Sequence, residues 1–243
     1  NFSIDLRGFY ADSEVEIDGF TATGLGDTNE VSYREDLVGY AGINANFLDG
    51  RLRNRLGIAY TRIDRSNFSF DTDSETFDAF GENVRYEYQG VFDAAEIAEL
   101  VFGAEREESE YLSSSFGAPA IGDKVWINSA YGQLNLTPYQ GLSLTGGVRY
   151  DDHETYGNNT TFAASGAYSP NGGDTVLRGS YGEGFKAPAL FQLFSDFGNT
   201  ALEPEESESW DVGITHSFLD GRAQVGVTYF ERDAENLIAF VGC

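Results

Sequence analysis

Few residue patterns in this chain could support metal binding. Carboxylates recur at short spacing in "DTDSE", where Asp71, Asp73 and Glu75 are followed by Asp78, and closely spaced oxygen ligands are typical of a hard-cation site. The segment lacks the central glycine and the distal glutamate of an EF-hand loop. We therefore interpret it as a solvated acidic loop, with calcium binding as the alternative.

Catalytic motifs are also missing. The two histidines, His153 and His216, are far apart in the sequence, and there is no G-x-S-x-G, H-E-x-x-H or C-x-x-C. "GEGFKA" at Gly182–Ala187 loosely matches a dinucleotide fingerprint, but that fingerprint needs a βαβ unit and here Pro188 follows directly. The sequence predicts no enzyme, no cofactor and no metal centre.

Binding chemistry is concentrated in Glu183–Glu206, which combines aromatic and acidic residues. Pro188 is well placed to start a short helix, on which Leu190, Phe191 and Phe194 would gather on one side. Such an apolar cluster in an acidic loop could clamp a bulky ligand, and the alternative is that it only packs the loop onto its neighbours. The candidate ligand-binding residues are Phe185, Phe191, Phe194 and Phe197.

The segments that must position these residues are predicted to be β-strands. In "LSLTGGVRY" apolar residues alternate with Ser143, Thr145 and Arg149, and Trp210–Phe218, Leu52–Tyr60 and Ala223–Tyr229 alternate in the same way. We expect about eleven strands, and read "FDAAEIAELVF" as a turn followed by a strand rather than a helix. The charges on one face carry both signs, as a polar lumen requires: Arg53, Arg55, Arg149, Arg178 and Asp211.

The amino-acid composition excludes several further classes of protein. Forty acidic and 15 basic residues give a net charge of -25, so no basic surface is available for nucleic acid. The 41% hydrophobic and 14% aromatic content is too high for a disordered chain. No apolar run is long enough for a membrane-spanning helix. Because the chain opens and ends within strand-like runs, without methionine, we expect it to be part of a longer protein.

The connectors alternate between long and short. Short turns are expected at Leu48–Gly50, Asp93–Ala95, Thr137–Gly141, Ser169–Asp174 and Leu219–Gly221, an intermediate one at His153–Asn159, and long loops at Asp12–Glu30, Ser66–Glu82, Arg106–Ile121 and Glu183–Glu206. Up-and-down strands would place all long loops at one end, which is the layout of outer-membrane barrels. "FLDGR" occurs twice, at Phe47–Arg51 and Phe218–Arg222, and its Asp-Gly pair suits a tight turn with positive φ at the periplasmic rim.

A transmembrane barrel is favoured over the alternative of a soluble β-sandwich, in which one buried and one wet face give the same alternation. The strands look long enough to cross a bilayer at about 9–11 residues or more. Aromatic residues crowd the expected strand ends, as interfacial girdles do: Tyr10, Phe47, Tyr60, Tyr150, Tyr181, Phe218 and Tyr229.

Three stretches of the last quarter resemble a known family. "SYGEGFKAPALFQLF" (Ser180–Phe194), "GNTALEPEESESWDVGI" (Gly198–Ile214) and "YFERDAENLI" (Tyr229–Ile238) look like the barrel of TonB-dependent outer-membrane receptors. The resemblance covers the order and spacing of these motifs, and the rest of the chain agrees in pattern. Residues 1–243 would then be a fragment of the receptor's β-barrel domain, without the plug domain and the last strands.

The resemblance implies an antiparallel up-and-down barrel of about 22 strands, closed by a plug, in the outer membrane of a Gram-negative bacterium. It implies a receptor that binds a scarce nutrient, cobalamin or a ferric siderophore, and imports it with energy from the TonB complex, which contacts the N-terminal part outside this chain. Its other partner would be outer-membrane lipid. Cys243 would begin an extracellular loop and pair with a cysteine beyond the chain. The alternatives are a passive porin and a secreted glycan-binding β-sandwich.

Overall fold

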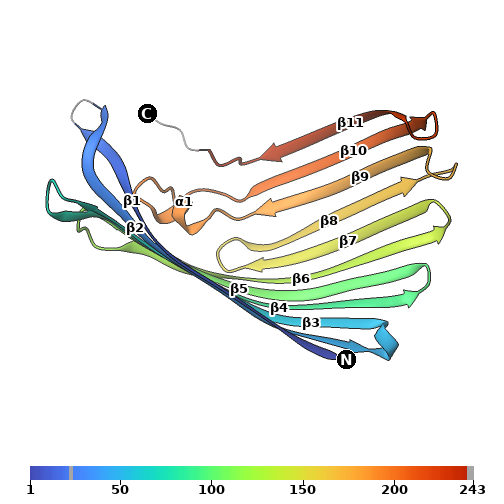
Figure 1. Cartoon of the computed structure of the whole chain (residues 1–243), viewed down its shortest axis with the longest axis horizontal. Helices are drawn as coiled ribbons and strands as arrows, with labels where there is room; N and C mark the ends of the chain where they lie inside the picture. The colour runs from blue at the N-terminus through green and yellow to red at the C-terminus, as the bar shows by residue number, and fades with distance from the viewer. Residues whose placement is uncertain (22–23, 240–243) are drawn as a thin grey trace.

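The chain forms one curved antiparallel sheet (Figure 1). The computed structural model describes residues 1–21 and 24–239, and in this part eleven strands pair in strict sequence order, β1 to β11. The strands are β1 (Phe2–Thr21), β2 (Gly24–Phe47), β3 (Leu52–Ser69), β4 (Ser74–Ala95), β5 (Ala98–Ser115), β6 (Ile121–Tyr139), β7 (Leu142–His153), β8 (Gly157–Tyr168), β9 (Thr175–Lys186), β10 (Glu205–Phe218) and β11 (Ala223–Glu235). Two short elements accompany them, η1 (Leu48–Gly50) and α1 (Leu190–Phe194).

The predicted all-β, up-and-down architecture is therefore confirmed, including the turn and strand read in "FDAAEIAELVF". The sheet is open, because β1 and β11 each pair on one side only. Within residues 1–21 and 24–239, no helix has the length and apolarity that a membrane-spanning helix needs.

The two faces of the sheet differ in chemistry. One face, here called the apolar face, carries exposed rows such as Ile4, Ile43 and Leu56, which are register partners on β1, β2 and β3. Leu177, Ile214 and Val227 form a similar row on β9, β10 and β11. The opposite, polar face lies on the side where α1 is found (Figure 1).

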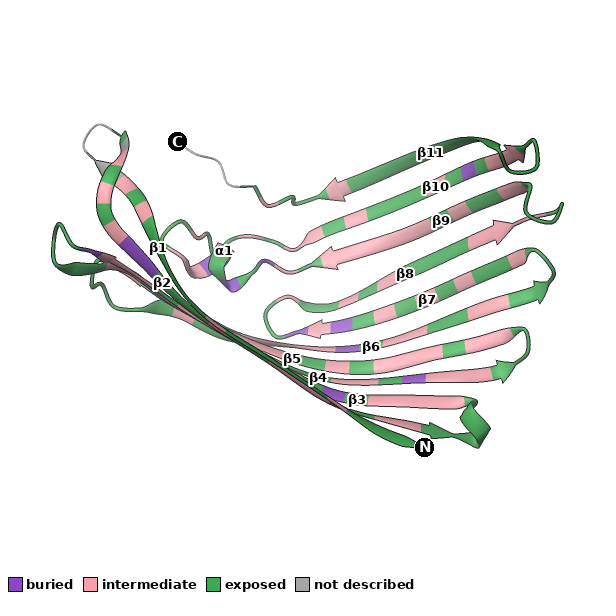
Figure 2. Ribbon diagram, in the orientation of Figure 1, coloured by how far each residue is buried: buried purple, intermediate pink, exposed green. Residues whose placement is uncertain are grey.

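The sheet has almost no hydrophobic core. Among the described residues only Val31, Leu190 and Leu193 are buried apolar side chains, and the strands are mainly intermediate or exposed (Figure 2). A soluble sandwich would bury one face of each sheet against the other. The sandwich alternative is thus wrong, and an apolar face of this size is the kind that lies against lipid.

The repeated "FLDGR" segment adopts the same turn twice. In both copies three successive residues have positive φ: Leu48, Asp49 and Gly50 (53°, 56° and 92°), and Leu219, Asp220 and Gly221 (54°, 56° and 82°). Both turns are closed by an arginine N–H that donates to the leucine carbonyl, at 3.1 Å in the first copy and 3.3 Å in the second. The predicted positive-φ turn is confirmed, and both copies lie at the same end of the sheet (Figure 1).

Three of the four expected long loops are wrong, because the strands continue through them. The β1–β2 ladder extends to the pair Thr21 and Gly24, and the β3–β4 ladder to Ser69 and Ser74. Most of Arg106–Ile121 likewise belongs to β5, which ends at Ser115. Only Glu183–Glu206 contains a long stretch without strand structure. Beyond the apolar band both faces of a strand meet water, so alternation of hydrophobicity fades and the strands resemble loops.

Of the aromatic residues predicted at strand ends, Phe47 and Phe218 do end β2 and β10, whereas the tyrosines lie within their strands. Tyr10 and Tyr60 lie in the middle of β1 and β3, and Tyr181 is the register partner of Trp210. The expectation that these tyrosines end their strands is therefore wrong, because the strands continue past the band. Their arrangement still agrees with an interfacial girdle.

Candidate ligand-binding mouth

The polar face carries ion pairs in place of a core. Arg149 contacts Glu105 at 3.1 Å and Asp151 at 2.9 Å, and the Ser129 hydroxyl donates to Asp151 at 2.6 Å. Arg53 pairs with two acidic residues of β4 and β5. The predicted polar face with charges of both signs is thus present, and these charges are mutually satisfied.

An ion pair between Lys186, the last residue of β9, and Glu205, the first residue of β10, joins the two ends of the β9–β10 loop at 3.2 Å. Within it, α1 forms after Pro188, as predicted, although Ala189 is the N-cap. The Gln192 side chain accepts a hydrogen bond from the Ala189 N–H at 2.8 Å. The Asn199 N–H then donates to the Gln192 carbonyl at 2.8 Å, which folds the chain back over the helix.

Three contacts fasten this loop to the sheet. The Phe191 ring meets Tyr111 of β5 edge-on, with 6.0 Å between ring centroids. The Ser115 hydroxyl at the end of β5 donates to Asp196. The Tyr156 hydroxyl, in the β7–β8 turn, donates to the Leu202 carbonyl at 3.2 Å. We call the region where the β9–β10 loop meets the β5–β6 and β7–β8 turns the mouth.

The structure places the four candidate aromatic residues in different surroundings. Phe191 is 54% exposed despite its contact with Tyr111, and Phe194 is intermediate. Phe197 is 78% exposed. Phe185 lies near the end of β9 as the register partner of Glu206, on the opposite face from Tyr111. The structure thus brings Phe191, Phe194 and Phe197 together on one loop and separates Phe185 from them.

The expected apolar side of the helix is partly wrong. The buried pair is Leu190 with Leu193, whereas Phe191 is exposed. Residues three apart lie on the same side of a helix, so the leucines anchor α1 and leave Phe191 available. Tyr111 was not identified from the sequence, because its contact with Phe191 joins segments 80 positions apart.

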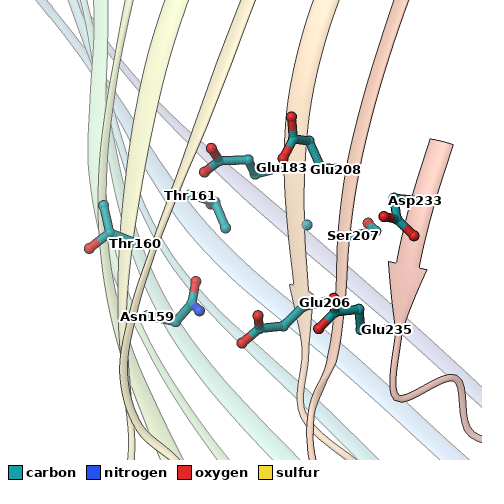
Figure 3. Close-up of a pocket in the computed structure, with 10 residues that line it drawn as sticks. Asn159, Thr160, Thr161, Glu183, Glu206, Ser207, Glu208, Asp233 and Glu235 are labelled. Carbon is teal, nitrogen blue, oxygen red and sulfur yellow. The ribbon is translucent and has the colours of Figure 1, made fainter. Parts of the chain in front are cut away.

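An acidic cleft opens where β8 and β9 separate (Figure 3). Their ladder ends at the pair Ala163 and Gly182, and beyond it the Phe162 N–H donates to the Glu183 carboxylate at 3.0 Å. The cleft has a volume of about 290 Å³. Five carboxylates line it together with smaller polar residues: Glu183, Glu206, Glu208, Asp233 and Glu235.

These carboxylates lie on adjacent strands, and Glu208 is the direct partner of both Glu183 and Asp233. They share the face of Trp210, so they form an acidic zone next to the aromatic border. In the described residues, no set of three or more His, Cys, Asp or Glu side chains is arranged to hold a metal ion. The cleft therefore concentrates negative charge on the apolar-face side of β9, β10 and β11, opposite to Tyr111 and the mouth, where it repels anions.

The other predicted positions lie elsewhere. Asp71 and Asp73 are in the β3–β4 turn, where Asp71 accepts a hydrogen bond from the Asn29 N–H at 3.2 Å. Glu75 belongs to β4. This arrangement does not assemble the calcium site that was the alternative reading. Cys243, with its predicted disulfide, lies outside the described residues.

The fold and the mouth together define a class: an up-and-down membrane-type β-barrel with a loop folded over its polar face. The family described as "TonB dependent receptor-like, beta-barrel" matches residues 1–243. The chain therefore belongs to the TonB-dependent receptor β-barrel family, whose members are receptors and transporters rather than enzymes.

Individual relatives agree. The "Vitamin B12 transporter BtuB" of Photobacterium profundum is 25% identical over 251 aligned positions, which cover 99% of this chain and 38% of the relative. The "Ferripyoverdine receptor" of Pseudomonas aeruginosa is 30% identical over 50% of this chain and 16% of its own length. The siderophore receptor PirA of P. aeruginosa has the same fold, with a TM-score of 0.72 and 18% identity over 96% of this chain and 43% of that one. The chain thus spans less than half the length of each of these relatives.

Proposed function

We propose that this chain is the barrel part of an outer-membrane receptor that binds a scarce nutrient and imports it with TonB-supplied energy. The nutrient is cobalamin or a ferric siderophore. The protein lies in the outer membrane of a Gram-negative bacterium, with the β9–β10 loop facing outward. TonB contacts a part of the receptor N-terminal to this chain.

The observation that carries this proposal is the β9–β10 loop, which is fastened over the polar face by Tyr111, Ser115 and Tyr156. A receptor needs a few exposed aromatic groups on a rigid support, because such groups bind a bulky ligand with little loss of conformational freedom. The vitamin and siderophore relatives support the same ligand classes.

The mouth is tested by replacing Phe191 and Phe194 with alanine in the complete receptor. Affinity for vitamin B12, ferripyoverdine and ferric enterobactin is measured by titration calorimetry. For the probe that the wild type binds, we expect a loss of about tenfold or more, as for aromatic contacts at binding sites. Phe70→Ala is the matched control, because Phe70 is 50% exposed in a different turn. Unchanged affinity in the double variant would assign Phe191 and Phe194 to loop packing.

Active import is tested separately from binding. The gene upstream of the codon for Asn1 is read for a signal peptide, a TonB-contacting segment and a plug of one small domain. These features would support energy-coupled transport. A signal peptide that leads directly into further β-hairpins would mean a passive porin, and the receptor proposal would then be wrong.

A further inference from the structure

We infer that Phe116, at the tip of the β5–β6 turn, is a further ligand-contacting residue that selects nutrients with a flat, uncharged ring surface. This inference rests on the proposed receptor function. With 82% exposure, Phe116 is the most exposed large apolar side chain in the described part of the protein. The segment Phe116–Ile121, "FGAPAI", is uncharged in a chain with 40 acidic residues.

The backbone holds this phenyl ring in a disfavoured conformation. Phe116 has φ 51° and is followed by Gly117 at φ 70°. A bulky residue rarely adopts the left-handed region, which glycine or asparagine occupies easily. Nothing in packing explains the choice of phenylalanine, because its ring is almost fully exposed. Leu48 and Leu219 have nearly the same φ in the two "FLDGR" turns, so the angle alone does not mark a binding site; here it sets the direction in which an exposed aromatic ring is presented.

The surroundings do fix this turn. The Phe116 N–H donates to the Thr76 carbonyl of β4 at 3.0 Å, and the Ala118 N–H donates to the Ser115 carbonyl at 3.0 Å. The Ser114 hydroxyl donates to the Ala118 carbonyl at 2.7 Å. The ring is therefore presented on a rigid support, so that little conformational entropy is lost on contact with a ligand.

The turn belongs to the mouth already described. Ser115, directly before Phe116, donates a hydrogen bond to Asp196 in the β9–β10 loop. Tyr111, four residues earlier on the same strand, supports Phe191. The β5–β6 turn, which carries Phe116, and the β9–β10 loop, which carries the α1 aromatic residues, are therefore held together by contacts near the end of β5.

The chemistry of the ligand follows from these neighbours. An exposed phenyl ring binds the flat face of another ring by stacking and burial of apolar surface. Asp196, which accepts a hydrogen bond from the neighbouring Ser115, disfavours a negative charge at this point. The group that meets Phe116 is thus a planar, uncharged part of the nutrient, such as an uncharged macrocycle or aromatic ring.

The test uses the complete receptor and the probes vitamin B12, ferripyoverdine and ferric enterobactin. F116G and F116N remove the ring but accept a left-handed backbone, so the melting temperature should stay equal or rise. For the probe bound by the wild type, Kd should increase about tenfold in both variants. F116Y keeps the ring and should retain affinity within about threefold. Phe70→Ala is again the control for loss of an exposed aromatic residue.

Wild-type affinity in F116G and F116N would overturn this inference while leaving the receptor function intact. Equal weakening in F116Y would also overturn it, because the ring would then not be the group that matters. If the wild-type receptor binds none of the probes, the proposed function is wrong, and the role of Phe116 falls with it.

Discussion

Acidification should loosen the mouth through His153, the last residue of β7. Its side chain is only 7% exposed, and its Nδ1 accepts hydrogen bonds from the N–H groups of Thr155 at 3.1 Å and Tyr156 at 3.4 Å. Nδ1 must therefore be unprotonated. The Tyr156 ring packs on the imidazole, with 5.1 Å between centroids, and its hydroxyl reaches Leu202 in the β9–β10 loop. A proton on Nδ1 would disrupt the turn that holds this tether.

The direction of the effect follows from the pKa of His153. Burial lowers this pKa below the ordinary value of 6.5, and the charge of Glu154 opposes the shift only in part. Between 6.5 and the lowered value, the opened turn binds more protons than the closed turn. The closed turn is thus fully stable above pH 6.5, and it loses stability as the pH falls through this interval.

The magnitude follows from the two hydrogen bonds. A buried donor that loses its acceptor costs about 1–3 kcal/mol. Thr155 is exposed, so that water can replace its acceptor, and the Tyr156 bond is long. We therefore expect the turn to lose about 1 kcal/mol between pH 7.5 and 5.5, which raises its opening equilibrium about fivefold, within the roughly tenfold limit that linkage sets one unit below 6.5.

Hydrogen exchange measured by mass spectrometry at pH 7.5 and 5.5, corrected for intrinsic rates, checks this prediction. Peptides from the β7–β8 turn and the β9–β10 loop should both lose protection at the lower pH, while the β2–β3 turn should not. In His153→Asn the amide oxygen can still accept from the backbone but does not titrate, so protection should no longer depend on pH. Equal protection of wild-type peptides at both pH values, or persistent pH dependence in the variant, would refute this reasoning.

Two further substitutions test the frame that supports the mouth. Arg149→Met leaves the buried Asp151 without its cation. Because Arg149 is more than one-third exposed and its charge is partly screened by solvent, the barrel should lose only about 1–2 kcal/mol of stability. Urea unfolding should show this loss, and a second change of Asp151 to Asn should restore much of it. A Cβ at Gly122 would lie 1.8 Å from a backbone oxygen of β5. Gly122→Ala should therefore lower the melting temperature and expose the β5–β6 pairing to hydrogen exchange. Gly132 is on the same strand with open space around it, so Gly132→Ala should have little effect.

Local patterns predicted the architecture because each strand and turn carries its own signal. Alternation over "LSLTGGVRY" requires only that β7 has one apolar and one polar face, and both copies of "FLDGR" form the same turn. Strand ends were predicted poorly for the same reason. The outer part of β3, "DRSNFS" at Asp64–Ser69, is mainly polar on both faces, so the alternation that identifies a strand weakens there although the pairing continues to Ser69 and Ser74.

The mouth was predicted less completely, because its contacts are not local. The short helix after Pro188 could be read from the sequence, but the supports of that helix could not. Ser115 and Asp196 are 81 positions apart, and nothing in "YLSSSFGAPA" indicates which distant loop this turn meets. Phe116 was not predicted as a site residue because its distinguishing feature is a positive φ, and a phenylalanine in the sequence does not indicate such a backbone angle.

Because the sheet has almost no core, the few contacts that fasten the β9–β10 loop to the sheet determine its position. In a soluble domain, loops are carried by a packed interior, whereas here Leu190 and Leu193 are two of the three buried apolar residues in the described part of the chain. The strands are held by backbone ladders, and their apolar face is left for lipid. The position of the β9–β10 loop thus depends on a few side chains of β5 and the β7–β8 turn. Affinity in such a mouth should respond to changes at Tyr111, Ser115 and Tyr156, which support the loop, as well as to changes at the exposed aromatic residues.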